Sequence, residues 1–371
     1  MQQNSRLNGV HSIAFYWNIT AILWVAAGGW YLFPPAPATV EYYFNRGWYR
    51  WMLDWVTPLT EWFRYPLILI LLPGACLCFL VFWAKNWTHI RWAQRRSHWS
   101  GFSWGLKRLA CALPILVLWF LAFWGAGYRR LPVETRLHMD TSVISEPEML
   151  RFRGLLLRQI NGNLVASQSR DPLRSVRAIS LSMTRIIHAW DGLPIRLPDR
   201  VKFTPAGFLM CNGTSGICSP FTLEPLVDNG LPDASAVNSA AHELGHIAGF
   251  CAEDEASFVG YLAGMQAEDS FARYACSLSA YMDAIGSLSK NGFEMAFEAL
   301  PDVAKRDVRR EEDAFRRYRV AWFSRISWPV YNRYLQSQGI DEGLKNYSHG
   351  ITLLCYALRG VGKQQSVRVA E

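Results

Sequence analysis

The sequence predicts a mainly α-helical protein with two parts. Residues 1–128 are expected to form a membrane anchor of three transmembrane helices, and residues 129–371 a mostly helical, extracytoplasmic domain with a small β element. Of the 17 Trp residues, 14 precede Tyr128, and so do three long apolar segments. This part also has 10 basic and only three acidic residues, whereas the remainder has 28 and 27. Because the excess positive charge accompanies the apolar segments, it favours a membrane protein over a nucleic-acid-binding one.

The three apolar segments cover about 12–33, 66–83 and 109–128, each close to the roughly 20 residues that a transmembrane helix needs. For the first segment, a cleaved signal peptide is the competing interpretation, because Arg6 precedes it and Ala36-Pro37-Ala38 resembles a cleavage site. The segment is longer than a signal core of roughly 7 to 15 residues, which favours a retained helix.

Charge between these segments predicts their orientation. Residues 85–108 contain six basic and no acidic residues, whereas residues 34–64 contain three of each. The positive-inside rule then places 85–108 and the N-terminus in the cytoplasm, and residues 129–371 outside the cytoplasmic (inner) membrane. Arg129, Arg130 and Arg136 oppose this orientation with three charges against six.

Residues of about 45–63, between the first two spans, have Trp residues at helical spacing and a polar stripe on another face. The stripe consists of Arg46, Arg50 and Asp54, four residues apart. This pattern predicts a helix in the membrane interface, with indoles at headgroup depth. Packing of this helix against the spans is an equally compatible alternative.

In the outer part, helical patterns at about 146–161 and 173–190 precede a stretch of short apolar runs broken by Pro, Gly and Asn. These runs predict strands at 201–203 and 208–210, with 218–223 as a further candidate, and plain loops as the alternative. A strand beside a metal-binding helix would pair with an extended substrate. Cys211 and Cys218 flank a flexible loop, and a disulfide and two free thiols are equally compatible with their spacing.

The next helix contains His242-Glu243-Leu244-Gly245-His246. Residues four apart share a helix face, so His242 and His246 can present two imidazoles to one metal ion, with Glu243 beside them to take a proton from water. This donor set suits zinc hydrolysis. Coincidence is the alternative, because composition produces such a pattern in about one chain in a hundred of this length. Gly249 is expected to end the helix in a left-handed conformation.

Glu253 and Glu255 are the candidates for a third ligand. Two residues apart, they point to different sides of a helix that begins here, so only one is expected to reach the metal. Ser257 lies four residues after Glu253 and can hydrogen-bond a ligand from outside, which favours Glu253. Two solvated acids at the positive end of a helix are the alternative.

Tyr347 and His349, near the start of the last helical pattern, are candidates for a donor to a developing oxyanion. Core packing for Tyr347 and a surface position for His349 are the alternatives.

These motifs together resemble a bacterial membrane-protein family of unassigned function that is usually identified as gluzincin-like zinc metallopeptidases. The resemblance covers nearly the whole chain: the three spans, Ser219 to Pro225, His242 to His246 with Glu253 to Phe258, and the segments 334–339 and 343–347. It implies a zincin-like domain with Zn²⁺ as cofactor.

The helix that begins at Glu253 is similar to the third-ligand helix of His-Glu-Leu-Gly-His regulatory peptidases and of integral-membrane CaaX-type peptidases. In those families the first Glu binds zinc, which implies Glu253 here. Two features depart from the pattern: Ser257 stands where Asn or Asp is commoner, and the gap between His246 and Glu253 is shorter than in most gluzincins. The resemblance implies no particular substrate.

The sequence therefore predicts a membrane-anchored zinc metallopeptidase that acts on a peptide or protein substrate. His242, His246 and Glu253 would bind zinc, and Glu243 would be the general base. The alternative is a non-catalytic membrane assembly or sensing protein that keeps the zinc domain and binds a membrane-protein partner through its aromatic-rich spans. The presence of Glu243 favours the enzyme, because a structural zinc site needs no general base.

Overall fold

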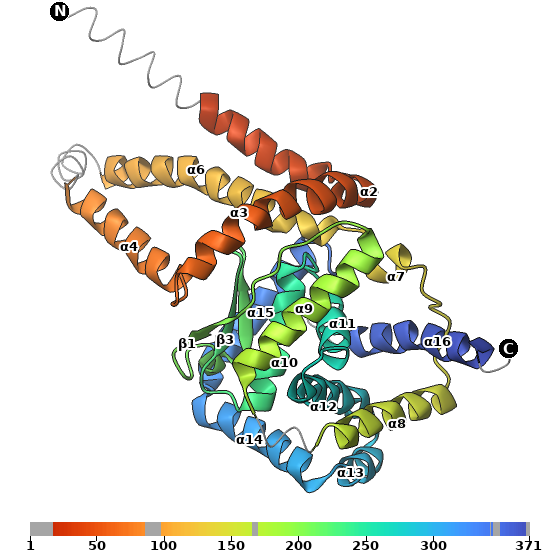
Figure 1. Ribbon diagram of the computed structural model, residues 1–371. Helices are drawn as coiled ribbons and strands as arrows, with labels where there is room; N and C mark the ends of the chain where they lie inside the picture. The colour runs from red at the N-terminus through yellow and green to blue at the C-terminus, as the bar shows by residue number, and fades with distance from the viewer. Residues whose placement is uncertain (1–17, 86–97, 165–169, 342, 344–348, 369–371) are drawn as a thin grey trace, which may run out of the picture.

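The structure, a computed structural model, describes residues 18–85, 98–164, 170–341, 343 and 349–368. It is mostly helical with one small three-stranded sheet, as the sequence predicts (Figure 1). Residues 12–17 of the first expected span, the basic residues Arg91, Arg95 and Arg96, and the candidate donor Tyr347 lie outside the described residues.

The N-terminal helices extend away from the rest of the molecule (Figure 1). They comprise a first helix (Asn18–Leu32), α2 (Pro37–Thr39), a π-helix (Val40–Trp48), α3 (Tyr49–Trp62), α4 (Ile68–Lys85) and α6 (His98–Phe123). The first helix contacts α6, where the Trp24 indole N–H donates to the carbonyl of Ala110 at 2.8 Å. The third expected span, 109–128, is displaced: α6 begins at His98 and ends at Phe123, and a 3-10 turn (Gly125–Arg129) follows it.

Within the described residues, no helix on its own has both the length and the apolar character of a membrane span. The first helix and the segment Pro37–Trp62 meet these criteria only as a pair, which is bent by 118° at the break between them. The apolar stretches Ile68–Val81 and Ala110–Phe123 are shorter. Three separate spans thus stay a prediction.

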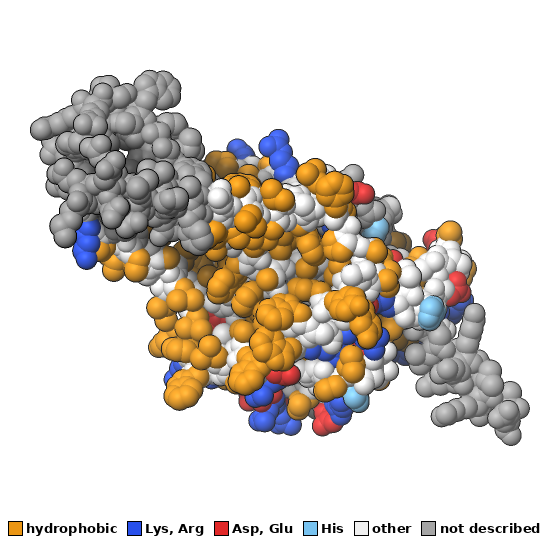
Figure 2. Space-filling model, turned by 90° about the horizontal axis from the view of Figure 1, so that it is seen from above, with side chains coloured by type: hydrophobic (Ala, Val, Ile, Leu, Met, Phe, Trp, Pro, Cys, Tyr) orange, Lys and Arg blue, Asp and Glu red, His pale blue; other side chains and the backbone are white. Residues whose placement is uncertain are grey.

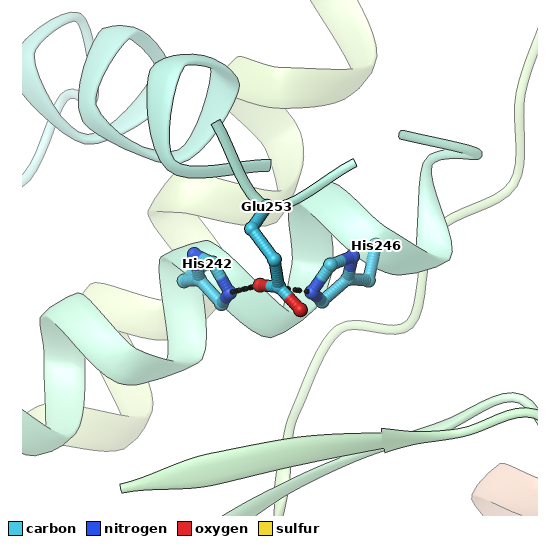
Figure 3. A group of neighbouring side chains, drawn as sticks. All are labelled: His242, His246 and Glu253. Atoms are coloured by element: carbon cyan, nitrogen blue, oxygen red, sulfur yellow. Dashed lines mark hydrogen bonds and ion pairs between the residues drawn. The ribbon is translucent and has the colours of Figure 1, made fainter. Parts of the chain in front are cut away.

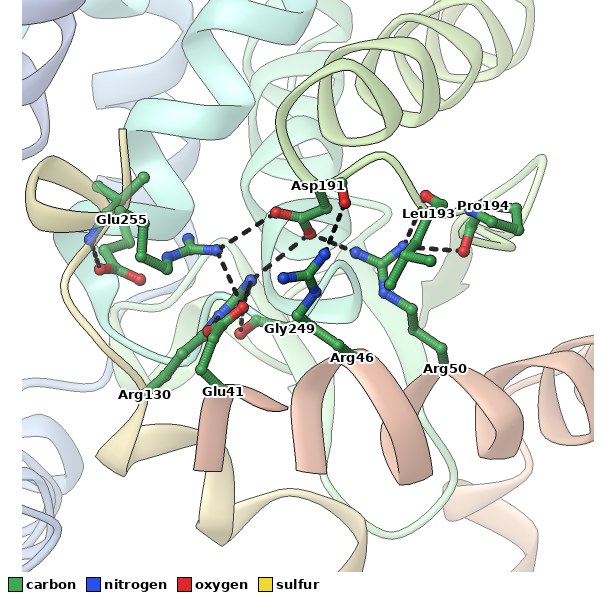
Figure 4. A network of polar contacts seen from close by, with 11 residues as sticks. Glu41, Arg46, Arg50, Arg130, Asp191, Leu193, Pro194, Gly249 and Glu255 are labelled. Carbon is green, nitrogen blue, oxygen red and sulfur yellow. Dashed lines mark hydrogen bonds and ion pairs between the residues drawn. The ribbon is translucent and has the colours of Figure 1, made fainter. Parts of the chain in front are cut away.

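The predicted interfacial helix is present as the π-helix followed by α3. Its indoles face outward, with Trp51, Trp55 and Trp62 exposed. The polar stripe faces the other way: Arg46 donates to the carbonyl of Asp191, and Arg50 to those of Leu193 and Pro194, all at 2.8 Å (Figure 4). Arg46 and Arg50 therefore attach this helix to residues 191–194, whereas Asp54 is exposed. On the aromatic face, the Trp48 indole N–H donates to the carbonyl of Ala122 in α6 at 2.7 Å.

A second set of charged residues, Glu41 and Arg130, connects the N-terminal helices with the interior of the domain. The Arg130 guanidinium donates to the Glu41 carboxylate at 2.5 Å and to the carbonyl of Gly249 at 3.3 Å (Figure 4). Gly249 lies two residues after the end of the predicted metal-binding helix, and the Tyr49 hydroxyl donates to the carbonyl of the last helical residue, Ile247, at 3.0 Å. The N-terminal helices are thus hydrogen-bonded to the end of that helix.

The sheet contains β1 (Lys202–Thr204), β2 (Gly216–Ser219) and β3 (Glu224–Asp228) in the order β1-β3-β2. β1 is parallel and β2 antiparallel to β3. The strand predicted at 201–203 is confirmed within one residue. The strand predicted at 208–210 is wrong: the backbone N–H groups of Leu209 and Met210 donate to the buried Asp228 carboxylate, so this segment forms a turn instead.

The candidate strand at 218–223 is confirmed only in its first residues, because β2 ends at Ser219 and Leu223 has a left-handed φ of 52°. Cys211 and Cys218 are both free thiols, so the structure contains no disulfide between them.

The remaining helices form one domain, with α10 and α11 at its centre. They are α7 (Val133–Arg136), α8 (Glu146–Gly162), α9 (Pro172–Asp191), α10 (Asp233–Ile247), α11 (Glu253–Met265), α12 (Ser270–Gly286), α13 (Lys290–Glu298), α14 (Asp302–Tyr318), α15 (Ala321–Ser337) and α16 (Gly350–Arg368). α10 packs on α11 through small residues. A Cβ on Gly245 would lie 2.7 Å from the carbonyl oxygen of Ala256, so no larger residue fits there without a shift.

Candidate metal centre

The motif residues and the preferred third ligand come together between α10 and α11. The Glu253 carboxylate points between the two imidazoles, with one oxygen 3.1 Å from His242 Nε2 and 3.3 Å from His246 Nε2 (Figure 3). Gly249 allows this approach, because its φ of +90° reverses the chain after α10 and lets α11 begin at Glu253. The prediction that the chain turns sharply at this glycine is confirmed.

These three side chains fit a zinc ion. Each can offer one donor atom, and the three atoms lie within 4.8 Å of one another. Tetrahedral zinc with bonds of about 2.0–2.1 Å separates its ligand atoms by roughly 3.3 Å, close to the two measured separations. Two imidazoles and one carboxylate are also the protein ligands of several catalytic zinc sites, which keep a fourth position open.

The other ring nitrogen of each histidine has a partner that fixes the ring. His246 Nδ1 lies 2.8 Å from the carbonyl of Phe250, an acceptor, so Nδ1 carries a proton and Nε2 is the nitrogen that would bind a metal. His242 Nδ1 lies 3.1 Å from the Ser257 hydroxyl. Such outer contacts orient metal ligands, and the role predicted for Ser257 is present in the geometry.

Glu243 lies beside the cluster but is not one of its three donors. It is buried, and its Oε2 atom has no hydrogen-bond partner among the described residues. A Cβ on Gly216 of β2 would lie 2.6 Å from the other carboxylate oxygen, so the strand passes directly against Glu243. Burial raises the pKa of Glu243 to about 7, although His242 and His246 act in the opposite direction.

The ligand residues carry opposite charge in the absence of metal. Burial alone would raise the pKa of Glu253, but His246 and His242 outweigh it and hold this pKa well below its usual range. Burial would likewise lower the pKa of His246, but the Glu253 carboxylate raises it to about 9. The cluster therefore holds a proton that a bound metal would displace.

Glu255, the other candidate ligand, points away from the cluster. Its carboxylate accepts a hydrogen bond of 2.6 Å from the backbone N–H of Val133. Burial raises the pKa of Glu255 to about 7, although the nearby Arg136 acts in the opposite direction. Glu253 and Glu255 thus lie on different sides of α11, as their spacing predicts.

Two cavities meet at the cluster, and both are lined by Gly216, His242 and Glu243. The inner cavity, of about 310 Å³, lies beside β2, Trp124 and Tyr331. The outer cavity, of about 890 Å³, is lined by Ser257 and His349 among others. His349 is thus brought to a cavity wall next to the motif, while its predicted role as a donor stays a prediction.

The edge strand β2 lines both cavities. Within the described part of the chain β2 pairs only with β3, so no strand pairs with its other edge. An extended peptide can add to such an edge by main-chain hydrogen bonds.

One comparison with known proteins gives a match. A family model described as "Protein of unknown function (DUF3810)" matches residues 44–355, most of the chain. The chain belongs to this family. The matched range contains the three candidate ligands, Glu243 and β2, so the candidate site lies inside the family's own boundaries. Searches of curated proteins and of solved structures found no significant match.

Sequence reasoning missed the aromatic residues that complete the site within the family range. The Tyr331 hydroxyl of α15 donates to the Glu253 carboxylate, and the ring of Tyr334 stacks on that of Tyr331 with centroids 5.8 Å apart. Trp124, which directly follows α6, contacts His246 edge to face at 5.7 Å. Tyr331 is 78 residues from Glu253, and no local pattern in the sequence signals so distant a pairing.

Proposed function

We propose that the protein is a membrane-anchored zinc metallopeptidase. The observation that carries the proposal is the buried Glu243 carboxyl beside the donor cluster. Glu243 is not one of the three donors, and its Oε2 atom has no hydrogen-bond partner among the described residues. A buried carboxyl without a partner costs stability, so its position suits a task in the cavity rather than in the fold.

His242, His246 and Glu253 would hold the metal, and zinc bound there would supply a Lewis acid that lowers the pKa of water and polarises a carbonyl. Glu243 takes a proton from the attacking water and passes it to the leaving amine. Ser257 and the carbonyl of Phe250 keep the two imidazoles in place. The edge of β2 that is not paired with β3 would align the substrate backbone along the inner cavity.

We assign Tyr331 the donor role that was predicted for Tyr347 or His349. Its hydroxyl lies at the cluster and its ring lines the inner cavity, which supports a role beside the negative charge that would develop on the scissile carbonyl. His349 lines the outer cavity instead.

A location in the cytoplasmic membrane with the site outside is the second part of the proposal. The first helix and α6 run in one direction and α4 in the other, as three successive spans require (Figure 1). The exposed indoles of α3 suit headgroup depth, and the arginine stripe behind them attaches the domain to this surface.

The decisive test compares full-length wild type with Glu243→Gln, both solubilised and loaded with zinc. The variant is expected to retain zinc but to cleave a pool of mixed-sequence fluorogenic peptides about 100-fold or more slowly, because general base catalysis contributes 10²–10⁴-fold. Equal cleavage by both proteins would overturn the mechanism. Bound zinc in a wild type that cleaves nothing and co-purifies with a larger complex would favour the non-catalytic assembly protein instead.

A further inference from the structure

α15 exposes apolar side chains on the face that points away from the candidate site. Its inner face carries Trp328, Tyr331 and the buried Leu335, whereas Trp322, Ile326 and Val330, four residues apart, are 66%, 63% and 63% exposed. Surface helices normally have the opposite arrangement, with polar residues outward. The outer face of α15 therefore lacks a partner within the described part of the chain.

The outer face of α15 is continuous with the apolar surface of the N-terminal helices. Tyr334, near the end of α15, packs on Phe120 of α6 with ring centroids 6.1 Å apart and on Tyr128 at 6.0 Å. α6 itself exposes Ile115, Leu116 and Trp119. Figure 2 shows hydrophobic side chains over much of the face that carries the N-terminal helices, with charged side chains mostly at its margins.

The charges on α15 favour an anionic surface. The helix contains Arg325 and Arg333 and no acidic residue, and both arginines are exposed. Arg317 and Arg319 precede it and are also exposed, whereas the exposed Arg316 is paired with Asp313 at 3.1 Å. Aromatic and aliphatic residues beside arginines are typical of helices that lie in the headgroup region of anionic membranes.

The site itself lies next to the end of α6. Trp124 is the first residue after this helix, and it is both buried against His246 and part of the inner cavity wall. If α6 ends at the membrane surface, the cluster lies at that surface too.

We propose that α15 is a second interfacial helix, with Trp322, Ile326 and Val330 in the lipid headgroup region, and that the substrate is a polypeptide held at the membrane surface. Lipid contact by α15 follows from exposure, charge and continuity alone. The substrate class in addition rests on the proposed peptidase function.

Photo-crosslinking of the full chain tests the lipid contact. The protein is reconstituted in vesicles of phosphatidylethanolamine and phosphatidylglycerol with benzoylphenylalanine in place of Ile326, of Trp55 in α3, or of Met295 in α13. Met295 is the matched control, because it is apolar and 71% exposed but lies on α13, at the end of the molecule opposite to the N-terminal helices (Figure 1). We expect lipid adducts at Ile326 within about twofold of those at Trp55 and roughly fivefold or more above those at Met295.

Adducts at Ile326 no more frequent than at Met295 would overturn the contact, and so would adducts of twice the chain mass, which would identify a second copy as the occupant. Neither measurement depends on zinc or on cleavage, so this result stands apart from the fate of the proposed function.

Cleavage of tethered and free peptides tests the substrate class. A mixed-sequence peptide pool is supplied to wild-type vesicles at equal bulk concentration, either free or with an N-terminal palmitoyl chain. We expect the tethered pool to be cleaved about tenfold faster or more, because tethering raises its concentration at the membrane. Equal rates would overturn the substrate class alone, whereas cleavage of neither pool would overturn the peptidase function and the substrate class with it.

Discussion

α11 and α4 are both largely apolar helices, but their environments are opposite. Every residue of α11 except Asp254 is buried by α10, α9, α12 and α16. In α4, every residue from Ile70 to Val81 is exposed. The two helices differ in side-chain size: beyond Glu253, Asp254 and Glu255, α11 has several Ala, Gly and Ser residues, whereas α4 has Leu, Ile and Phe along most of its length.

Small side chains let helices approach one another closely. Large apolar side chains that contact no other helix are instead stable in an apolar surrounding such as lipid. Around α11, close packing fixes Glu253 against the histidines and leaves little freedom to the site. Around α4, the described part of the chain provides no cover from Ile70 to Val81, and a bilayer would. The protein's own helices thus cover α11, whereas under the proposed membrane location lipid would cover α4.

The largest effect is expected from the ligand carboxylate in α11. Glu253→Gln should lower zinc affinity about 1000-fold or more, beyond the 10–100-fold that changes in outer contacts cost. Glu255→Gln is the matched control, because Glu255 is also buried in the first turn but binds the backbone of Val133. Competition with a fluorescent chelator measures the zinc affinity of both full-length variants. Zinc retained by Glu253→Gln and lost by Glu255→Gln would reassign the third ligand.

The exposed helix is expected to respond nearly as strongly to charge. Leu77 lies at the middle of α4, and Leu77→Lys should disfavour insertion by about 2.5–3.5 kcal/mol if lipid surrounds it. An insertion assay by glycosylation mapping gives the inserted fraction. Leu150→Lys on α8 changes an equally exposed leucine of the outer domain, and there the thermal unfolding should shift by about 0.5 kcal/mol or less. Unchanged insertion of α4 with Lys at position 77 would show that water rather than lipid surrounds this helix.

The predictable part of the site comes from residues close in the chain. His242, Glu243 and His246 share one helix, and Gly249 and the helix start at Glu253 follow within a few residues. Four-residue spacing and a glycine stop are local rules, so the sequence alone predicted the cluster and preferred Glu253 to Glu255.

What could not be predicted depends on distant contacts. Tyr331 and Trp124 reach the cluster from α15 and from the end of α6, and neither carries a local signal. The apolar residues from Phe208 to Met210 predict a strand, but they form a turn, because Asp228 accepts from the N–H groups of Leu209 and Met210. Hydropathy alone predicts α4 and α6 as equivalent spans. It does not show whether protein or lipid covers an apolar helix, because that depends on neighbouring elements.

A smaller effect is expected from one methyl group at the helix contact. Gly245→Ala places a Cβ 2.7 Å from the backbone oxygen of Ala256, and such overpacking costs about 1–3 kcal/mol. Gly74→Ala in α4 meets nothing within 4 Å and should be neutral or slightly stabilising, because alanine favours helices by up to about 1 kcal/mol. Thermal unfolding of both variants in the same detergent distinguishes them. Equal stability of the two would mean that α10 and α11 are not in close contact.

The smallest effect is expected from the hydroxyl behind His242. Ser257→Ala removes the partner of Nδ1 and should lower zinc affinity about tenfold, or ~1.4 kcal/mol, because the ring loses one constraint but keeps its packing. Ser277→Ala in α12 is the matched control, because that hydroxyl is equally buried but has no hydrogen-bond partner among the described residues. Its loss should leave zinc affinity unchanged in the same chelator competition. If both variants bind zinc like wild type, close packing of α10 on α11 alone positions His242. The difference between the tightly packed α11 and the exposed α4 would then be larger than the hydrogen bond suggests.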